Sequence, residues 1–260
     1  MRELPVRGKM RKVLALFFAL TFCSYSWAAK DTLLVTASAN GDGGVPFTSA
    51  VGVWWPDLPK KPRSGVPKDL ASATVVVWFH GGMTSGNCRK GFVAGDDFSK
   101  LFPHVIVVSA SACRENHWVT PTMESVIEAA LDSVAARRKA PVGEVSLVGV
   151  SDGALGVLNY SMRGKRRVRD RLLVSSFGKL LGDAHAMASV PKMHEGRWFF
   201  LQGGNDRLFS SDEAVPWIKA FCSEFMANCT LWFDLSGEHD WSYWRKNHLD
   251  DIRDAIRTVK

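Results

Sequence analysis

Apolar runs that have the character of β-strands recur along the whole chain. Several of them are almost continuously apolar, as expected for strands that are covered on both faces. The runs span residues 32–38, 51–56, 73–80, 104–110, 144–150, 171–177, 197–203 and 230–236.

Helical patterns lie between these runs. In residues 120–139 the apolar side chains repeat on one helix face, Thr120 can cap the start, and Pro121 suits the first turn. Residues 210–226 and 241–259 predict two further helices, and another is expected directly after residue 151. Alternating strands and helices predict an α/β fold: a mostly parallel eight-stranded sheet with helices on both faces. Binding sites in such sheets form at the carboxyl ends of the strands.

Length and composition fit one globular domain preceded by a signal peptide. The chain has 260 residues, of which 46% are hydrophobic and 23% charged. Residues 1–28 combine a basic start, the apolar stretch 13–22 and small residues before Ala29, which predicts cleavage after Ala28. Cys23 raises the alternative of a lipoprotein signal, but Phe22 fits that poorly. We therefore expect a domain over residues 29–260, secreted or periplasmic, with no membrane span in the mature chain.

Removing the predicted signal peptide changes the charge balance. Residues 1–28 contain five Lys or Arg residues and one acidic residue, so the formal net charge falls from +7 to +3. A basic cluster remains at residues 163–171, between a predicted helix and a predicted strand. It lacks interleaved aromatic residues, which favours a solvated charged turn over a nucleic-acid site.

Export also changes the interpretation of the cysteines. Cys88, Cys113, Cys222 and Cys229 remain after cleavage, and an even number in an oxidising compartment predicts two disulfides. Among the three connectivities, we favour Cys88 with Cys113 and Cys222 with Cys229, because each pair is close in sequence and flanks adjacent elements. No CxxC motif or clustered histidines accompany them, so we expect neither metal nor cofactor.

Ser151 is the first candidate for chemistry. It lies in "GVSDGAL" (149–155), directly after the apolar run 144–150 and before a predicted helix. Gly149 and Gly153 match a nucleophile elbow, a tight turn whose neighbours must be small and which exposes the serine hydroxyl. The same glycines also suit an ordinary tight turn, so the motif alone does not decide between the two.

A nucleophilic serine needs a base and a carboxylate that orients it. Asp206 follows the predicted strand 197–203, and His239 follows the predicted strand 230–236, each at a carboxyl end. The order Ser151, Asp206, His239 is the order of α/β-hydrolases. Asp212 is the best competing acid, but its place at a predicted helix start explains it through the helix dipole.

An oxyanion hole is expected after the predicted strand 73–80, in "HGGMTSG" (80–86). The amide of Gly82 or Met83 would supply one donor, and the amide of Asp152 the second. We expect His80 to be structural.

These motifs resemble the α/β-hydrolase superfamily. "WFHGG", "GVSDGALG" and "SGEHDWSYWRK" (236–246) narrow the resemblance to the esterase group that includes esterase D, enterobactin esterases, feruloyl esterases and mycolyltransferases. The resemblance implies a three-layer α/β-hydrolase fold and an acyl-enzyme on Ser151, with His239 as general base and then acid, oriented by Asp206. Ala154 replaces the second glycine that often ends the elbow, and the short stretch 178–196 leaves room only for a minimal lid.

We therefore expect an exported serine esterase acting on a small-molecule or polysaccharide-borne ester, with acetyl or feruloyl esters of carbohydrate as leading substrates. Trp118 and Trp241 are candidates for lining the substrate site, although a core position explains each equally well. An acyltransferase would use the same catalytic residues. A serine peptidase would need a larger cap, and an inactive binding module on the same scaffold would leave Ser151 unreactive.

Overall fold

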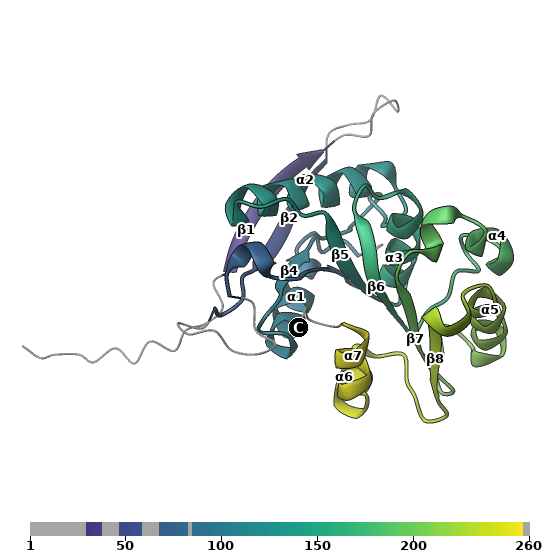
Figure 1. Ribbon diagram of the computed structural model, residues 1–260. Helices are drawn as coiled ribbons and strands as arrows, with labels where there is room; N and C mark the ends of the chain where they lie inside the picture. Colours follow the sequence, from purple (N-terminus) through teal and green to yellow (C-terminus); the bar gives the residue numbers. More distant parts are fainter. Residues whose placement is uncertain (1–29, 38–46, 59–67, 83–84, 257–260) are drawn as a thin grey trace, which may run out of the picture.

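The computed structural model describes residues 30–37, 47–58, 68–82 and 85–256. The predicted signal peptide and Met83 lie outside these residues. An eight-stranded sheet runs through the molecule in the order β1-β2-β4-β3-β5-β6-β7-β8 (Figure 1). The strands are β1 (Lys30–Ala37), β2 (Phe47–Trp54), β3 (Val75–Phe79), β4 (Ile106–Ser109), β5 (Glu144–Val150), β6 (Arg167–Val174), β7 (Arg197–Gly203) and β8 (Cys229–Asp234). β2 pairs antiparallel with both β1 and β4, and the other neighbouring strands are parallel.

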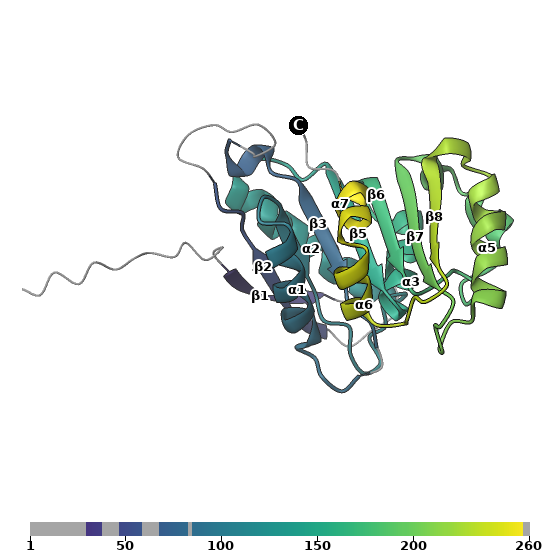
Figure 2. The ribbon, with the colours of Figure 1, turned by 90° about the horizontal axis from the view of Figure 1, so that it is seen from below.

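Helices cover both faces of the sheet, because the buried strands are apolar on both sides. In β3, for example, Val75, Val77 and Phe79 belong to one core and Val76 and Trp78 to the other. The first core is completed by α2 (Pro121–Arg138), α3 (Asp152–Arg163), α4 (Ala184–Ala188) and α5 (Ser211–Ser223). The second core is completed by α1 (Lys90–Leu101), α6 (Trp241–Asn247) and α7 (Leu249–Ala255), on the opposite face (Figures 1 and 2). The predicted three-layer α/β architecture is confirmed.

The basic cluster at residues 163–171 is not the solvated turn that we expected, because β6 begins within it at Arg167. Asp170 is buried and accepts hydrogen bonds from Arg169 at 2.9 Å and from Arg197 at 2.8 Å. Arg171 is 1% exposed. Burial lowers the pKa of Arg171 to about 9, which leaves the side chain charged at neutral pH. Two charged residues of the cluster, Asp170 and Arg171, are therefore buried within β6, whereas Arg163, Lys165 and Arg167 are exposed.

The helices differ from the prediction in two places. The expected helix 241–259 is divided at His248 into α6 and α7. α1 was not predicted, since its sequence "KGFVAGDDFSKL" is rich in glycine and polar residues. A side chain at Gly91 would collide with the carbonyl of Ala110, and one at Gly95 would collide with the ring of Trp54. The same glycines that weaken helix propensity thus let α1 pack closely on the sheet.

Both predicted disulfide pairings are present. Cys88–Cys113 joins the segment before α1 to the loop after β4, and Cys222–Cys229 joins the end of α5 to the start of β8. Between β6 and β7 the chain forms only α4 and a short 3₁₀ turn at Pro191–His194. No helix in the described part of the chain is long and apolar enough to cross a membrane.

Candidate active site

Ser151 occupies a strained turn between β5 and α3. Its φ is 55° and its ψ is −127°, a conformation that non-glycine residues rarely adopt and that is often found at functional sites. A side chain at Gly149 would collide with the carbonyl of Gly153, and one at Gly153 would collide with the carbonyl of Phe79. Both glycines are therefore required for the backbone to pass this closely, and the turn has the elbow shape that the sequence predicts.

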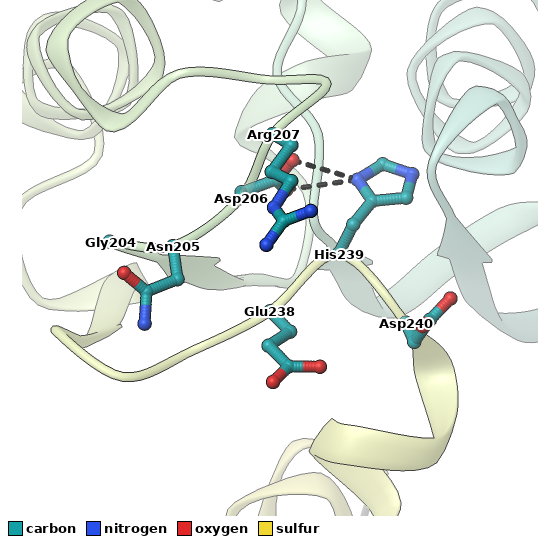
Figure 3. A pocket seen from close by; sticks show the side chains of 7 residues that line it. All are labelled: Gly204, Asn205, Asp206, Arg207, Glu238, His239 and Asp240. Carbon is teal, nitrogen blue, oxygen red and sulfur yellow. Dashed lines mark hydrogen bonds and ion pairs between the residues drawn. The ribbon is translucent and has the colours of Figure 1, made fainter.

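A continuous hydrogen-bond chain joins the three expected residues. The hydroxyl of Ser151 donates to Nε2 of His239 at 2.9 Å. Nδ1 of His239 donates to the two carboxylate oxygens of Asp206 at 2.9 and 3.0 Å (Figure 3). The carboxylate thus selects the tautomer in which Nε2 is free to accept a proton. A serine hydroxyl in this arrangement can be activated as a nucleophile.

Asp206 is fixed by the turn after β7. It is 6% exposed, and its Oδ1 accepts the backbone amides of Leu208 and Phe209, each at 2.9 Å. Burial alone would raise the pKa of the Asp206 carboxyl, but the hydrogen bonds from His239, Phe209 and Leu208 outweigh it and lower the pKa. The carboxylate is therefore ionised at neutral pH, as the orientation of the imidazole requires.

A buried serine directly after β6 supports the loop that carries His239. The hydroxyl of Ser175 accepts the indole N–H of Trp244 at 2.8 Å and donates to the carbonyl of Glu238 at 3.3 Å. Ser175 also has a positive φ of 52°. Its contacts hold the residue next to His239, a positioning role that no sequence motif indicated.

The glycine loop after β3 lies directly against Ser151. A side chain on Gly81 would come within 3.1 Å of Cβ of Ser151, so Gly81 is the loop residue that the structure places beside Ser151. Gly82, one of the expected donors, has a positive φ of 66° and turns the chain away from β3. The amide of Asp152, the other expected donor, belongs to the first residue of α3. Gly81 was overlooked at the sequence level, although the "HGG" motif contains it.

His80 and Trp118 hold this loop from inside the molecule. Nε2 of His80 accepts the amide of Ala112 at 3.1 Å, and Nδ1 donates to the carbonyl of Gly81 at 2.9 Å. Burial, only partly offset by the bond to Gly81, lowers the pKa of His80 to about 4, so the ring is neutral. Trp118 donates its indole N–H to the carbonyl of His80 at 2.9 Å and is 1% exposed. Trp118 therefore supports the loop from the core. Of the two interpretations that the sequence allowed, the core position is the one that the structure shows, and the position lining a substrate pocket is wrong.

Trp241, the other aromatic candidate, begins α6 and is partly buried. Its ring lies edge-on to Trp78 with centroids 4.8 Å apart, and it also approaches Phe98. It packs into the core beneath the His239 loop. It is not among the residues that line the pocket next to His239.

A polar pocket of about 660 Å³ opens beside His239. Figure 3 shows its walls, which are the loop after β7 and the loop after β8. The lining residues are Gly204, Asn205, Asp206, Arg207, Glu238, His239 and Asp240. Asp212, the competing acid, lies in the first turn of α5, where Ser210 caps its amide. Among the described residues, no cluster of His, Cys, Asp and Glu could hold a metal ion.

Comparisons with known proteins support the fold. No protein-family model and no curated protein sequence matches the chain. Among solved structures, a feruloyl esterase module from Clostridium thermocellum is similar with a TM-score of 0.61 at 14% identity, covering 90% of this chain and 90% of that chain. A fluorophosphonate-binding serine hydrolase from Staphylococcus aureus gives 0.58 at 11% identity, covering 87% of this chain and 97% of that chain. A cold-adapted esterase from an Arctic intertidal metagenomic library gives 0.57 at 17% identity, covering 87% and 93%. The chain therefore has the α/β-hydrolase fold.

Proposed function

We propose that this protein is an exported serine esterase that hydrolyses carboxylic esters through an acyl-enzyme on Ser151. The observation that carries the proposal is the hydrogen-bond chain from Ser151 through His239 to Asp206. The strained turn at Ser151 and the glycine loop packed against it add the two other features that acyl transfer requires.

In the first half of the reaction, Oγ of Ser151 attacks the ester carbonyl while Nε2 of His239 takes the hydroxyl proton. The negative charge that forms on the carbonyl oxygen faces backbone amides of the Gly81–Gly82 loop and of Asp152. The bond to the alcohol oxygen then breaks, and His239 gives its proton to that oxygen. In the second half, water attacks the acyl carbonyl while Nε2 of His239 takes a proton from it. The bond to Oγ of Ser151 then breaks, His239 returns the proton to Oγ, and the acid is released.

The alcohol portion of the substrate leaves beside His239, because this ring protonates it. The pocket on that side is lined by Asn205, Arg207, Glu238 and Asp240, whose amide, guanidinium and carboxylate groups can hydrogen-bond to hydroxyls. This polar lining favours a sugar or another polyhydroxylated alcohol. Acetyl or aryl esters of carbohydrate, small or polysaccharide-borne, are therefore the substrate class that we propose, and the short β6–β7 segment leaves the site open to them.

Export belongs to the same proposal. The basic and apolar residues 1–28 have the composition of a signal peptide, and two disulfides suit a secreted or periplasmic protein.

A substrate panel tests the reaction. Wild type and Ser151→Ala would be assayed with 4-nitrophenyl esters of rising chain length and with acetylated and feruloylated sugars. We expect wild type to hydrolyse short esters and Ser151→Ala to lose at least about 10³-fold in kcat, because the nucleophile is removed. Unchanged activity in Ser151→Ala would refute the mechanism.

Two controls complete the experiment. Ser133→Ala changes a serine on α2 whose hydroxyl bonds to the carbonyl of Ala129 in its own helix, and it should retain activity and labelling. A fluorophosphonate probe should label wild type at Ser151. No labelling of the folded protein would identify an inactive scaffold, whereas transfer of the acyl group to an added sugar in preference to water would identify an acyltransferase.

A further inference from the structure

We propose that Lys90 makes the enzyme select esters whose acyl portion carries a negative charge, such as monoesters of a dicarboxylic acid. The inference rests on the proposed esterase function, since it assigns a specificity to the same site. It comes from a cation that the proposed reaction does not use and that the fold holds close to the nucleophile.

The ammonium group of Lys90 lies on the glycine loop. A side chain added at Gly82 would collide with Nζ of Lys90, so this nitrogen lies directly beside Gly82. The preceding residue, Gly81, packs against Ser151, and a side chain there would lie 3.8 Å from Oγ. Gly82 therefore lies between the ammonium group of Lys90 and Gly81, the residue that packs against Ser151.

The backbone of Lys90 is anchored on both sides. Lys90 is the first residue of α1, and Cys88, two residues earlier, is bridged to Cys113. The amide of Gly91 donates to the hydroxyl of Ser111 at 3.0 Å, and its carbonyl accepts the hydroxyl of Ser109 at 2.9 Å. Movement of the ammonium is thus limited to the lysine side chain itself.

Neither an ion pair nor helix stability explains a lysine at this position. Among the described residues, no carboxylate lies within ion-pair distance of Lys90, whereas Lys100 on the same helix pairs with Asp96 at 2.8 Å. A cation in the first turn opposes the helix dipole, and the first turn of α1 contains no acidic residue to offset it. Within the described part of the chain, the position therefore carries a cation that forms no ion pair, close to Ser151.

Lys90 and Asp152 both act electrostatically on His80, the residue before the two glycines of this loop. Burial is the main reason that the pKa of His80 is low, and the hydrogen bond to Gly81 opposes it. The positive charge of Lys90 lowers this pKa further, whereas the negative charge of Asp152 raises it. Asp152 is the first residue of α3, where the helix dipole favours a carboxylate. The field of Lys90 thus reaches the glycine loop across which the ester carbonyl must lie.

Strand order determines which part of an ester can reach Lys90. β5, which carries Ser151, lies between β3 on one side and β6, β7 and β8 on the other. His239 and the polar pocket follow β7 and β8, so the alcohol portion leaves on that side. Lys90 lies on the β3 side, against the glycine loop. A carboxylate at the far end of a short acyl chain can therefore approach Lys90, while one on the alcohol is directed away from it.

Matched esters test this assignment. Mono-4-nitrophenyl glutarate and 4-nitrophenyl valerate have acyl chains of equal length, with and without a charge, and 4-acetoxybenzoate and phenyl acetate place the charge on the alcohol instead. We expect Lys90→Gln to lower the ratio of kcat/KM for glutarate over valerate by about tenfold, and Lys90→Glu to lower it further. Lys90→Arg should retain the ratio, and so should Lys100→Gln, a control at the far end of α1.

Each alternative result is informative. If Lys90→Gln lowered kcat/KM equally for the glutarate and the valerate ester, the cation would stabilise the oxyanion whatever the substrate charge. That result would overturn the proposal. A larger effect on 4-acetoxybenzoate than on glutarate would overturn the acyl-side assignment, and no change in any ratio would overturn the role of Lys90 altogether. Hydrolysis of valerate that Ser151→Ala abolishes would uphold the esterase function in all these cases. If wild type cleaves none of the esters, both proposals fail.

Discussion

The carboxylate of Asp206 is held by two backbone amides as well as by His239. The amides of Leu208 and Phe209 bind Oδ1, so the turn after β7 holds the carboxylate in place even when the imidazole rotates. The ring of Phe209 lies 5.6 Å from the ring of His239 and limits that rotation on one side. The orientation of the His239 ring is therefore fixed by the short segment from Asp206 to Phe209.

Asp206→Asn should lower kcat by about 10⁴-fold, because an amide no longer selects the tautomer that leaves Nε2 free to accept the serine proton. Asp212→Asn should keep wild-type activity, since Asp212 belongs to the first turn of α5. Both variants would be assayed with 4-nitrophenyl acetate. Similar losses in the two variants would mean that the wrong carboxylate was chosen.

Single residues differ in how far the sequence could predict them. The positions of Ser151, Asp206 and His239 follow from strand ends, which apolar runs reveal. Ser175 could not be found this way, because its importance comes from a contact with the carbonyl of Glu238 on a segment far away in the chain. Trp118 was ambiguous for a similar reason, since only the packed structure shows that its indole binds the carbonyl of His80.

At the scale of elements, His248 joins the two last helices to the last strand. Its Nε2 donates to Asp234 at the end of β8 and its Nδ1 donates to Asp251 on α7, both at 2.9 Å. The hydroxyl of Tyr243 on α6 also binds Asp234, at 2.6 Å. Burial opposes the charged imidazole, but the two carboxylates outweigh it and raise the pKa of His248. Hydrogen bonds from His248 and Tyr243 lower the pKa of Asp234 to about 2.

Stability should therefore depend on pH through His248. Because its folded pKa is raised, its contribution is complete below the unfolded pKa of about 6.5 and is lost as pH rises through the folded pKa. The contribution of Asp234 is present above its unfolded pKa and is lost as pH falls towards 2. We expect the difference in unfolding free energy between wild type and His248→Gln to be larger at pH 6 than at pH 9, measured by urea denaturation.

His185→Gln is the matched control, because His185 also pairs with a carboxylate, that of Glu224, but both side chains are exposed. It should change stability little at either pH. A difference for His248→Gln that is the same at both pH values would contradict the ionic role of this histidine.

Helix and strand prediction succeeded where hydrophobic periodicity was strong. β5 and β7 have the predicted bounds, and α2 differs from its prediction by one residue at each end. α1 was missed because its glycines are selected for close packing against the sheet, which local propensity does not register. The break between α6 and α7 was missed because it depends on the hydrogen bonds of His248 with residues on β8 and α7.

For the whole molecule, the two disulfides close loops of different lengths. Cys88–Cys113 spans 25 residues and Cys222–Cys229 spans 7. In the chain-entropy view, their removal would destabilise the protein by about 3.5 and about 2.4 kcal/mol, respectively. Only the first bridge also anchors the segment that leads to Lys90 and the glycine loop.

Export and oxidation can be tested together. Protein recovered from the periplasm or medium should begin at Ala29 by N-terminal sequencing and should contain both bridges. The double variant Cys88→Ser with Cys113→Ser should lose more stability and more activity than Cys222→Ser with Cys229→Ser, measured by urea unfolding and ester hydrolysis. An exported protein that retains residues 1–28, or equal effects of the two double variants, would contradict these expectations.

The contact between Ser151 and His239 spans 88 positions of the chain and is closed only through the sheet. A ribosome therefore makes Ser151 long before it makes His239, and the hydrogen-bond chain of Ser151, His239 and Asp206 can form only after β8 and the loop after it have been synthesised and paired. For the exported esterase that we propose, this order means that a chain still being synthesised, or passing through a translocon in extended form, would not hydrolyse the esters of the cell that makes it. The proposed activity would begin only where the whole sheet can fold.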